Sequence, residues 1–199
     1  MDRPVVVGLL GGIGSGKSAA CLILQRLGAE GVCADGITRK LLKNDEIKNQ
    51  ITGAFGKGVL DGSENIDRKK LADYAFSSRN NLKKIESILH PPVIMETIEK
   101  INMTPAGKVF VIDAPLLLES GMHHLCDYLI FIDAYKENRL IRAARKSRWT
   151  YREIERRQRF QRPLATKRKA ADFVISNNGN LGELKKQLQE IYRIIKRKK

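Results

Sequence analysis

The chain has 199 residues, 42% of them hydrophobic, which suits one α/β core with an insertion, or one large domain. This composition excludes a disordered chain, and no apolar run approaches the roughly 20 residues of a membrane span. The first residues lack the layout of a signal peptide. Three widely spaced cysteines, Cys21, Cys33 and Cys126, match neither a zinc site nor a disulfide framework, so we expect a cytoplasmic protein.

The net charge of +15 is concentrated in two segments. Residues 136–169 hold 14 Lys and Arg against 3 Glu, and residues 185–199 hold 7 against 1. Such segments attract phosphates or nucleic acid, although a solvated helix face has the same composition. We interpret the C-terminal segment as a solvated face and treat the middle segment as a functional candidate.

Strands and helices are expected to alternate along the chain. Short apolar runs predict strands at 4–11, 31–35, 108–115, 127–134 and within 171–179. Helical patterns follow Lys17, fill most of 36–101 and 135–170, and end in an amphipathic helix over 181–197. This alternation is typical of a parallel sheet with helices on both faces, whose sites lie at the carboxyl ends of the strands.

The first strand runs into the stretch GGIGSGKS, residues 11–18, which fits the phosphate-binding pattern GxxxxGK[ST]. Glycines let backbone N–H groups curl around an anion, and the following helix adds its positive end. Lys17 is expected to reach the β- and γ-phosphates of a nucleotide, and the Ser18 hydroxyl to hold Mg²⁺. The expected nucleotide contacts at the turn are Gly12, Ile13, Gly14, Ser15, Gly16, Lys17, Ser18 and Ala19.

A second interpretation of the same stretch is a dinucleotide fingerprint. Gly14, Gly16 and Ala19 fit its looser form, and Asp35 lies where a ribose-binding acid belongs. This interpretation leaves the Lys17–Ser18 pair unexplained, and its first glycine falls late in the turn.

Polar residues end several predicted strands. Asp35 is expected to close the second strand, where a carboxylate accepts the proton of an attacking hydroxyl, or to cap the helix that begins near Ile37. Asp113 closes the third strand as a candidate Mg²⁺ ligand or cap, and Asn177 follows the last strand. Glu119 follows in the same loop, and the sequence suits a surface acid there as well as a functional carboxylate.

The basic segment lies between two core strands, on the ligand side of the expected sheet. Aromatic residues alternate with its arginines, as in nucleic-acid binders. A phosphoryl-transfer enzyme uses two or three such arginines on a lid that closes over the phosphates and excludes water. We therefore expect a lid in which most of the cations are solvated.

The chain resembles the dephospho-coenzyme A kinase family over nearly its whole length. The matching pieces, in family order, are GGIGSGKS (11–18), AD (34–35), IDRKKLADYAF (66–76), the pair His90-Pro91, DAPLLLE (113–119), Arg142, Gln161 and ADFVISNNG (171–179). The resemblance implies transfer of the ATP γ-phosphoryl group to the ribose 3′-hydroxyl of dephospho-coenzyme A, the last step of coenzyme A synthesis.

The resemblance also implies a three-layer P-loop NTPase fold, with a mostly parallel five-stranded sheet, a helical insertion and a lid. Its parts would be a core of 1–35, 102–135 and 171–199, a substrate domain of 36–101 and a lid of 136–170. Carried over residue by residue, the resemblance implies that Asp35 is the general base and that Lys17 and Arg142 complete the catalytic residues. Arg142 and Asn177 join the nucleotide-binding residues, and Ser18 and Asp113 are the expected Mg²⁺ ligands. The expected substrate-binding residues are Asp35, His90, Pro115 and Leu116.

Three positions depart from the family pattern. Cys33 replaces an aspartate, Ala19 replaces a threonine and Lys146 replaces the second lid arginine. Lysine does not make the bidentate phosphate contact that arginine makes. Arg145 and Arg148 are the candidates for the role of the second lid arginine.

Two alternatives stay open. One is another small-molecule kinase, such as a nucleoside monophosphate kinase. The other is a non-catalytic ATP-binding protein that contacts nucleic acid. We expect ATP and Mg²⁺ as cofactors, dephospho-coenzyme A as the small-molecule partner, no membrane or nucleic-acid partner, and a monomer or weak homo-oligomer.

Overall fold

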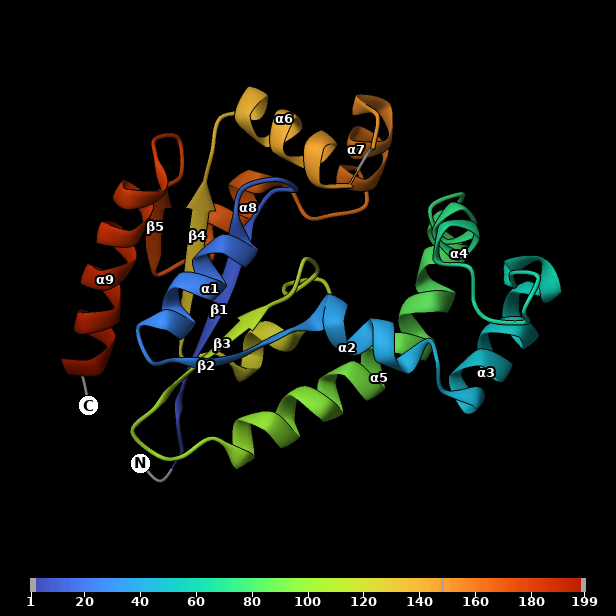
Figure 1. The fold of residues 1–199 in the computed structure, drawn as a ribbon, viewed down its shortest axis with the longest axis horizontal. Helices are drawn as coiled ribbons and strands as arrows, with labels where there is room; N and C mark the ends of the chain where they lie inside the picture. Colours follow the sequence, from blue (N-terminus) through green and yellow to red (C-terminus); the bar gives the residue numbers. More distant parts are fainter. Residues whose placement is uncertain (1–2, 148, 198–199) are drawn as a thin grey trace. The chain divides into compact units, whose positions relative to one another are not determined.

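A computed structural model describes residues 3–147 and 149–197 (Figure 1). The chain divides into two compact units, the first made of residues 1–34 and 98–199, and the second of residues 35–97. Each unit has its own arrangement of helices, and the sheet belongs to the first. The expected lid segment, 136–170, falls within the first unit.

The sheet has five parallel strands in the order β2-β3-β1-β4-β5. Its strands are β1 (Val5–Gly11), β2 (Glu30–Cys33), β3 (Val109–Asp113), β4 (Tyr128–Asp133) and β5 (Phe173–Ser176). The first strand lies in the centre and is buried along its whole length, because both faces are covered. This arrangement confirms the predicted parallel α/β sheet.

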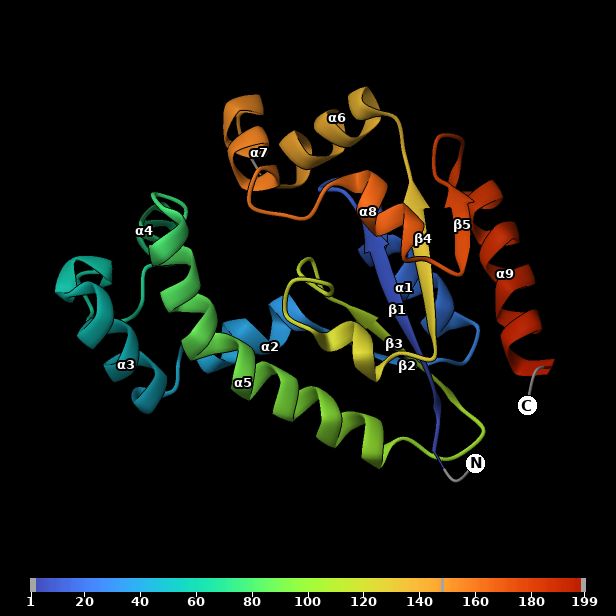
Figure 2. The ribbon, with the colours of Figure 1, turned by 180° about the vertical axis from the view of Figure 1, so that it is seen from behind.

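Alternate residues of the strands face opposite layers. One layer consists of α1 (Lys17–Arg26) and α9 (Leu181–Arg197), which bury apolar side chains against the odd-numbered residues of β1 and β3. Figure 1 shows α1 in front of the sheet. The other layer includes α8 (Leu164–Lys169), in front of the sheet in Figure 2, and the loop after β3. A Cβ on Gly8 would overlap Leu117 of that loop, so this layer packs tightly on β1.

Three helices of the first unit lie between the last two strands, β4 and β5. The segment between β4 and β5 forms α6 (Lys136–Ser147), α7 (Tyr151–Gln158) and α8. Thr150 starts α7 through a capping box with Glu153, whose carboxylate accepts from the Thr150 N–H at 2.9 Å. A single helical turn, η2 (Met122–Leu125), precedes β4.

The second unit is helical, as the sequence predicts. It contains most of α2 (Ala34–Leu41), then α3 (Asp45–Phe55), the short η1 (Lys57–Val59), α4 (Arg68–Ala75) and most of α5 (Arg79–Met103). Asn44 and Asp67 cap α3 and α4 by accepting backbone N–H bonds. Pro91 and Pro92 lie inside α5, which continues past them although neither donates a helical hydrogen bond.

One predicted boundary is wrong. The second strand was expected to reach Asp35, with a helix beginning near Ile37. The strand instead ends at Cys33 and α2 begins at Ala34, so Asp35 lies in the first turn of a helix. A carboxylate is favourable there because it faces the positive end of the helix dipole.

Candidate functional site: a phosphate-binding turn and its helical cover

The turn between β1 and α1 adopts backbone conformations that only glycine reaches without strain. Gly14 has φ of 76° and Gly16 has φ of 102°. A Cβ on Gly14 would overlap the backbone carbonyl of Arg139, and a Cβ on Gly16 would overlap the side-chain amide of Asn177. The glycines of the motif are therefore required twice, by the curvature of the turn and by the close approach of its neighbours.

Lys17 crosses the turn that precedes it. Its Nζ donates to the backbone oxygens of Gly11 at 3.1 Å and Gly12 at 3.0 Å. The ammonium group is thus held against the first residues of the turn, at the start of α1. Fixed amide dipoles, a helix N-terminus and an ammonium group together form a binding site for a polyanion such as a nucleoside triphosphate.

Asn177 connects the turn to the segment predicted to form a lid. Its Nδ2 donates to the Ser15 backbone oxygen at 2.7 Å, and its own backbone oxygen accepts from Arg142 Nη1 at 2.8 Å. The sequence placed both Arg142 and Asn177 at the nucleotide site, and the structure brings both to the turn. Asn177 is buried, so its bond to the Ser15 carbonyl is shielded from water.

Asp113 lies at the carboxyl end of β3, beside two other strand ends. Its register partners are Leu9 on β1 and Cys33 on β2, and its side chain is buried. It is therefore positioned next to the strand that leads into the phosphate turn. Pro115 and Leu116 follow it in the same loop and are half-buried.

The remaining predicted substrate residues belong to the second unit. Asp35 is exposed in the first turn of α2, two residues after the end of β2. His90 is half-buried within α5. Their roles remain predictions.

The sequence did not identify Arg139 as a site residue. It is one of the cations of the basic segment, most of which were expected to be solvated, yet it is 7% exposed and packs directly against the turn. Burial lowers the pKa of its guanidinium. Its position one helical turn before Arg142 was the available signal, because residues at this spacing share a helix face.

A buried ion pair joins the loop after β3 to α8. Lys167 Nζ lies 3.3 Å from Glu119 Oε1 and also donates to Pro115 O and Gln161 Oε1, at 3.3 and 3.1 Å. Glu119 Oε1 additionally accepts the Arg162 backbone N–H at 2.6 Å. Glu119 is therefore an internal connector, and its interpretation as a surface acid is wrong.

Metal binding at the turn would depend on few protein ligands. No cluster of three or more His, Cys, Asp or Glu suited to a metal occurs among the described residues. The candidates are one hydroxyl, of Ser18, and one carboxylate, of Asp113. This oxygen-only set fits Mg²⁺, which usually keeps several waters and is carried by one or two protein ligands together with substrate phosphates.

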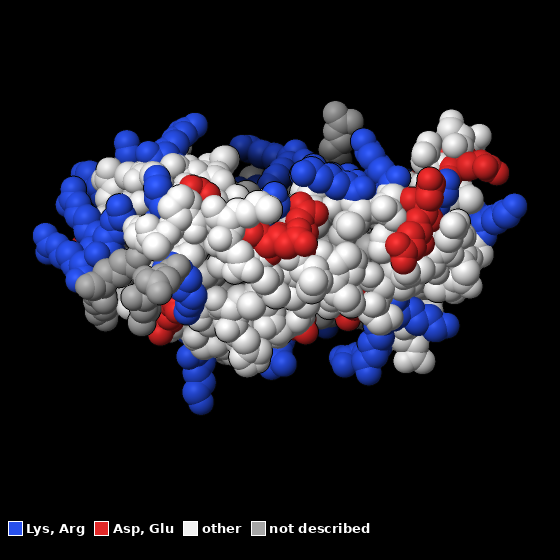
Figure 3. Space-filling model, turned by 90° about the horizontal axis from the view of Figure 1, so that it is seen from below, with Lys and Arg blue, Asp and Glu red and all other residues white. Residues whose placement is uncertain are grey.

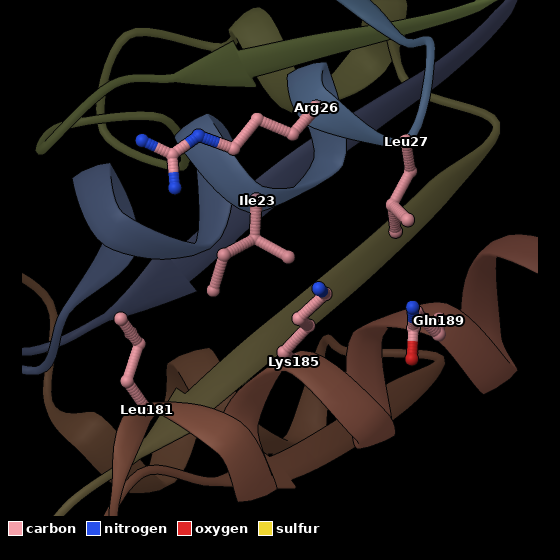
Figure 4. Close-up of a pocket in the computed structure, with 6 residues that line it drawn as sticks. All are labelled: Ile23, Arg26, Leu27, Leu181, Lys185 and Gln189. Atoms are coloured by element: carbon pink, nitrogen blue, oxygen red, sulfur yellow. The ribbon is translucent and has the colours of Figure 1, made fainter.

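Two features lie away from the turn. A pocket of about 170 Å³ between α1 and α9 is lined by Ile23, Arg26, Leu27, Leu181, Lys185 and Gln189, none of them a predicted site residue (Figure 4). In Figure 3 one dense group of Lys and Arg side chains lies on the left, the side of α9 in Figure 1, and other Lys and Arg side chains are spread over the rest of this view. The cations of α9 are exposed while its Leu184 and Leu188 are buried, as expected of an amphipathic helix.

Over the residues described, we find no helix with both the length and the apolar character of a membrane span.

Comparison with solved structures assigns the fold to the P-loop kinases. A shikimate kinase from Acinetobacter baumannii, 15% identical, aligns over 100% of this chain and 96% of its own with a TM-score of 0.53. A dephospho-CoA kinase from Campylobacter jejuni aligns over 96% and 97% with a TM-score of 0.68 and 26% identity. A Thermus thermophilus protein aligns over 97% and 98%, with a TM-score of 0.82 and 29% identity.

Sequence comparison then defines the family. The model for dephospho-CoA kinase matches residues 5–183. The dephospho-CoA kinases of Aquifex aeolicus and Geobacillus kaustophilus are 37% and 36% identical, each over 94% of this chain and covering 95% and 94% of those proteins. The chain belongs to the dephospho-CoA kinase family and is a kinase, which confirms the resemblance seen in the sequence.

Proposed function

We propose that this protein transfers the γ-phosphoryl group of ATP to the ribose 3′-hydroxyl of dephospho-coenzyme A. The observation that carries the proposal is the glycine turn with Lys17 held across it, in a chain of this family. The bond formed is between the 3′-oxygen and the γ-phosphorus. The bond broken joins that phosphorus to the bridging oxygen, and ADP leaves.

The turn holds the transferring end of the nucleotide. Its backbone N–H groups and Lys17 bind the β- and γ-phosphates and stabilise the charge that develops on them. Ser18 and Asp113 are the residues we assign to Mg²⁺, which when bound neutralises phosphate charge. Arg142 would exchange its bond to the Asn177 carbonyl for a phosphate oxygen when the nucleotide binds.

Asp35 is the proposed general base, accepting the proton of the 3′-hydroxyl as the oxygen attacks. His90, Pro115 and Leu116 are assigned to the substrate. Cys33 is exposed and stands where the family has a first aspartate, so Asp35, the second acid of that family pair, would act without a neighbouring carboxylate at position 33.

We assign the core to 1–35, 102–135 and 171–199, the substrate domain to 36–101 and the lid to 136–170. Lys146 and Arg145 are both exposed on α6, and Arg148 lies outside the described residues. We expect Arg142 to provide the bidentate phosphate contact of the lid. We further propose a cytoplasmic monomer or weak homo-oligomer.

The test is ADP release from ATP and Mg²⁺ in a coupled assay, with dephospho-coenzyme A beside a panel of nucleoside monophosphates. Turnover confined to dephospho-coenzyme A supports the proposal, and a product phosphorylated at the 3′-position completes it. Turnover with a nucleoside monophosphate alone would contradict the proposed substrate. ATP binding without any turnover would contradict catalysis, and a nucleic-acid titration at several salt concentrations would then test the non-catalytic alternative.

A further inference from the structure

Arg139 is a buried arginine at the base of the predicted lid. It lies in the first half of α6, and its guanidinium is fixed by two hydrogen bonds. Nε donates to the Ala134 backbone oxygen at 3.2 Å, and Nη1 donates to Gln158 Oε1 at 3.3 Å. Both acceptors are neutral, so the bonds orient the group without cancelling its charge.

No carboxylate oxygen lies within 4 Å of the Arg139 guanidinium among residues 3–147 and 149–197, and Asp133 and Glu137 attract it only from farther away. Two other cations of the same segment differ in this respect. Lys167 pairs with Glu119 at 3.3 Å, and Arg168 pairs with Asp133 at 2.7 Å. A buried charge without an opposite charge is unfavourable, so proteins rarely keep one unless an anion approaches it.

The phosphate turn is the immediate neighbour of this charge. A Cβ on Gly12 would overlap Arg139 Nη1, and a Cβ on Gly14 would overlap the backbone carbonyl of Arg139. The residue therefore lies in van der Waals contact with the loop that would hold the nucleotide phosphates. At this range, in a site partly shielded from water, one positive charge attracts a polyphosphate appreciably.

We propose that Arg139 is a positioning residue of the nucleotide site, which supplies positive charge to the phosphates and supports the turn from outside. The proposal rests on ATP being the phosphoryl donor. In the free protein only the more distant carboxylates of Asp133 and Glu137 offset this charge, and in the complex the phosphates offset it at close range. Arg139 and the bound phosphates thus stabilise each other across the turn.

A purely structural role makes a different prediction. If Arg139 only holds α6 to β4 and α7, its replacement lowers the stability of the free protein. The measured affinity for the nucleotide then falls only because less of the protein is folded. If its charge serves the phosphates, affinity falls in the folded protein, and the loss increases with the number of phosphates on the ligand.

The experiment compares Arg139→Met, which removes the charge at similar volume, with Arg139→Lys, which keeps it. Arg168→Met is the matched control, since Arg168 is paired with Asp133 at the surface. Calorimetric binding of adenosine, ADP and ATP is measured on each, together with the melting temperature with and without ATP. We expect Arg139→Met to weaken ATP binding on the order of tenfold, ADP less and adenosine not at all.

Arg139→Lys should keep most of the ATP affinity, and Arg168→Met should bind as the wild type does. Wild-type ATP affinity in Arg139→Met would overturn the inference, and so would an equal loss for adenosine and ATP. If Arg139→Met does not fold, Arg139→Lys decides: ATP affinity kept supports the role of charge, and affinity lost overturns it. A wild-type protein that does not bind ATP would instead contradict the proposed function.

Discussion

Lys167 and Glu119 form an ion pair inside the protein, with 3.3 Å between Nζ and Oε1 and side-chain exposures of 2% and 12%. Burial lowers the pKa of Lys167, and the Glu119 carboxylate acts in the opposite direction by favouring the ammonium form. The pair joins the loop that follows Asp113 to the helix that ends the predicted lid. The pair thus holds the loop after β3 against the C-terminal part of the predicted lid segment.

Lys167→Met should destabilise the protein by about 3 kcal/mol, because it leaves the Glu119 carboxylate buried without a cation. Glu119→Gln should cost a comparable amount, and the double variant less than the sum of the two. Urea unfolding of the four proteins measures this coupling. Arg168→Met, which breaks an exposed pair, is the control and should cost less than about 1 kcal/mol. Additive single effects would show that the two side chains are not coupled.

Asp35→Asn should reduce kcat by a factor on the order of 10² to 10⁴, because the amide does not accept the proton of the 3′-hydroxyl. ATP affinity should stay near that of the wild type, since the proposed role concerns the attacking oxygen. Steady-state kinetics combined with calorimetric ATP binding separate the two effects. Asp45→Asn is a suitable control, as Asp45 is an exposed residue in the first turn of α3. A collapse of ATP affinity would assign Asp35 to the metal or to the structure.

Gly14→Ala should abolish measurable ATP binding and lower stability by more than about 2 kcal/mol. The added methyl group would overlap the Arg139 carbonyl in a backbone conformation with φ of 76°. Gly53→Ala is the matched control, because a Cβ there meets nothing within 4 Å and the residue lies inside α3. That variant should be more stable by up to about 1 kcal/mol. Thermal melts with and without ATP compare the two, and normal ATP binding by Gly14→Ala would show that the turn tolerates a side chain.

The elements that the sequence predicted correctly have local signals. The apolar run of β1, the glycine turn and the helix after Lys17 are each determined by neighbouring residues, so pattern and spacing identify them. The position of Asn177 beside the turn followed from the rule that parallel strands end at one edge of the sheet, whereas Arg142 was placed there by the family resemblance.

The parts that the sequence did not predict depend on contacts between distant segments. Glu119 and Lys167 lie far apart in the chain, and nothing near either residue in the sequence indicates a partner. Charge counting gave the number of cations in the lid segment but not which of them is buried, so Arg139 was missed. The end of β2 was misplaced because Ala34 and Asp35 suit a strand end and a helix start equally.

The three cysteines should differ sharply in reactivity. Cys33 is exposed, whereas burial raises the pKa of both Cys21 and Cys126 to about 12. The thiolate is the reactive form, so at pH 8 Cys33 should react with an aromatic disulfide reagent in a fast phase that Cys33→Ser removes. The buried Cys21 should react only as the protein opens, and the half-buried Cys126, with its raised pKa, should react more slowly than Cys33. Two fast thiols in the native protein would contradict this burial.

The same raised pKa values predict that stability falls in alkali. Between the ordinary thiol pKa of 9.0 and about 12, the unfolded chain loses the protons of Cys21 and Cys126 while the folded protein keeps them. Fewer protons bound in the unfolded state means that the free energy of unfolding decreases as pH rises, by about 1.4 kcal/mol per pH unit for each thiol. Cys126→Ser keeps a donor for the Met122 carbonyl but does not ionise in this range. Urea unfolding from pH 9 to 11 should therefore show a free energy of unfolding that falls less steeply with pH in Cys126→Ser than in the wild type, by about 1.4 kcal/mol per pH unit. Equal slopes would mean that Cys126 titrates alike in both states.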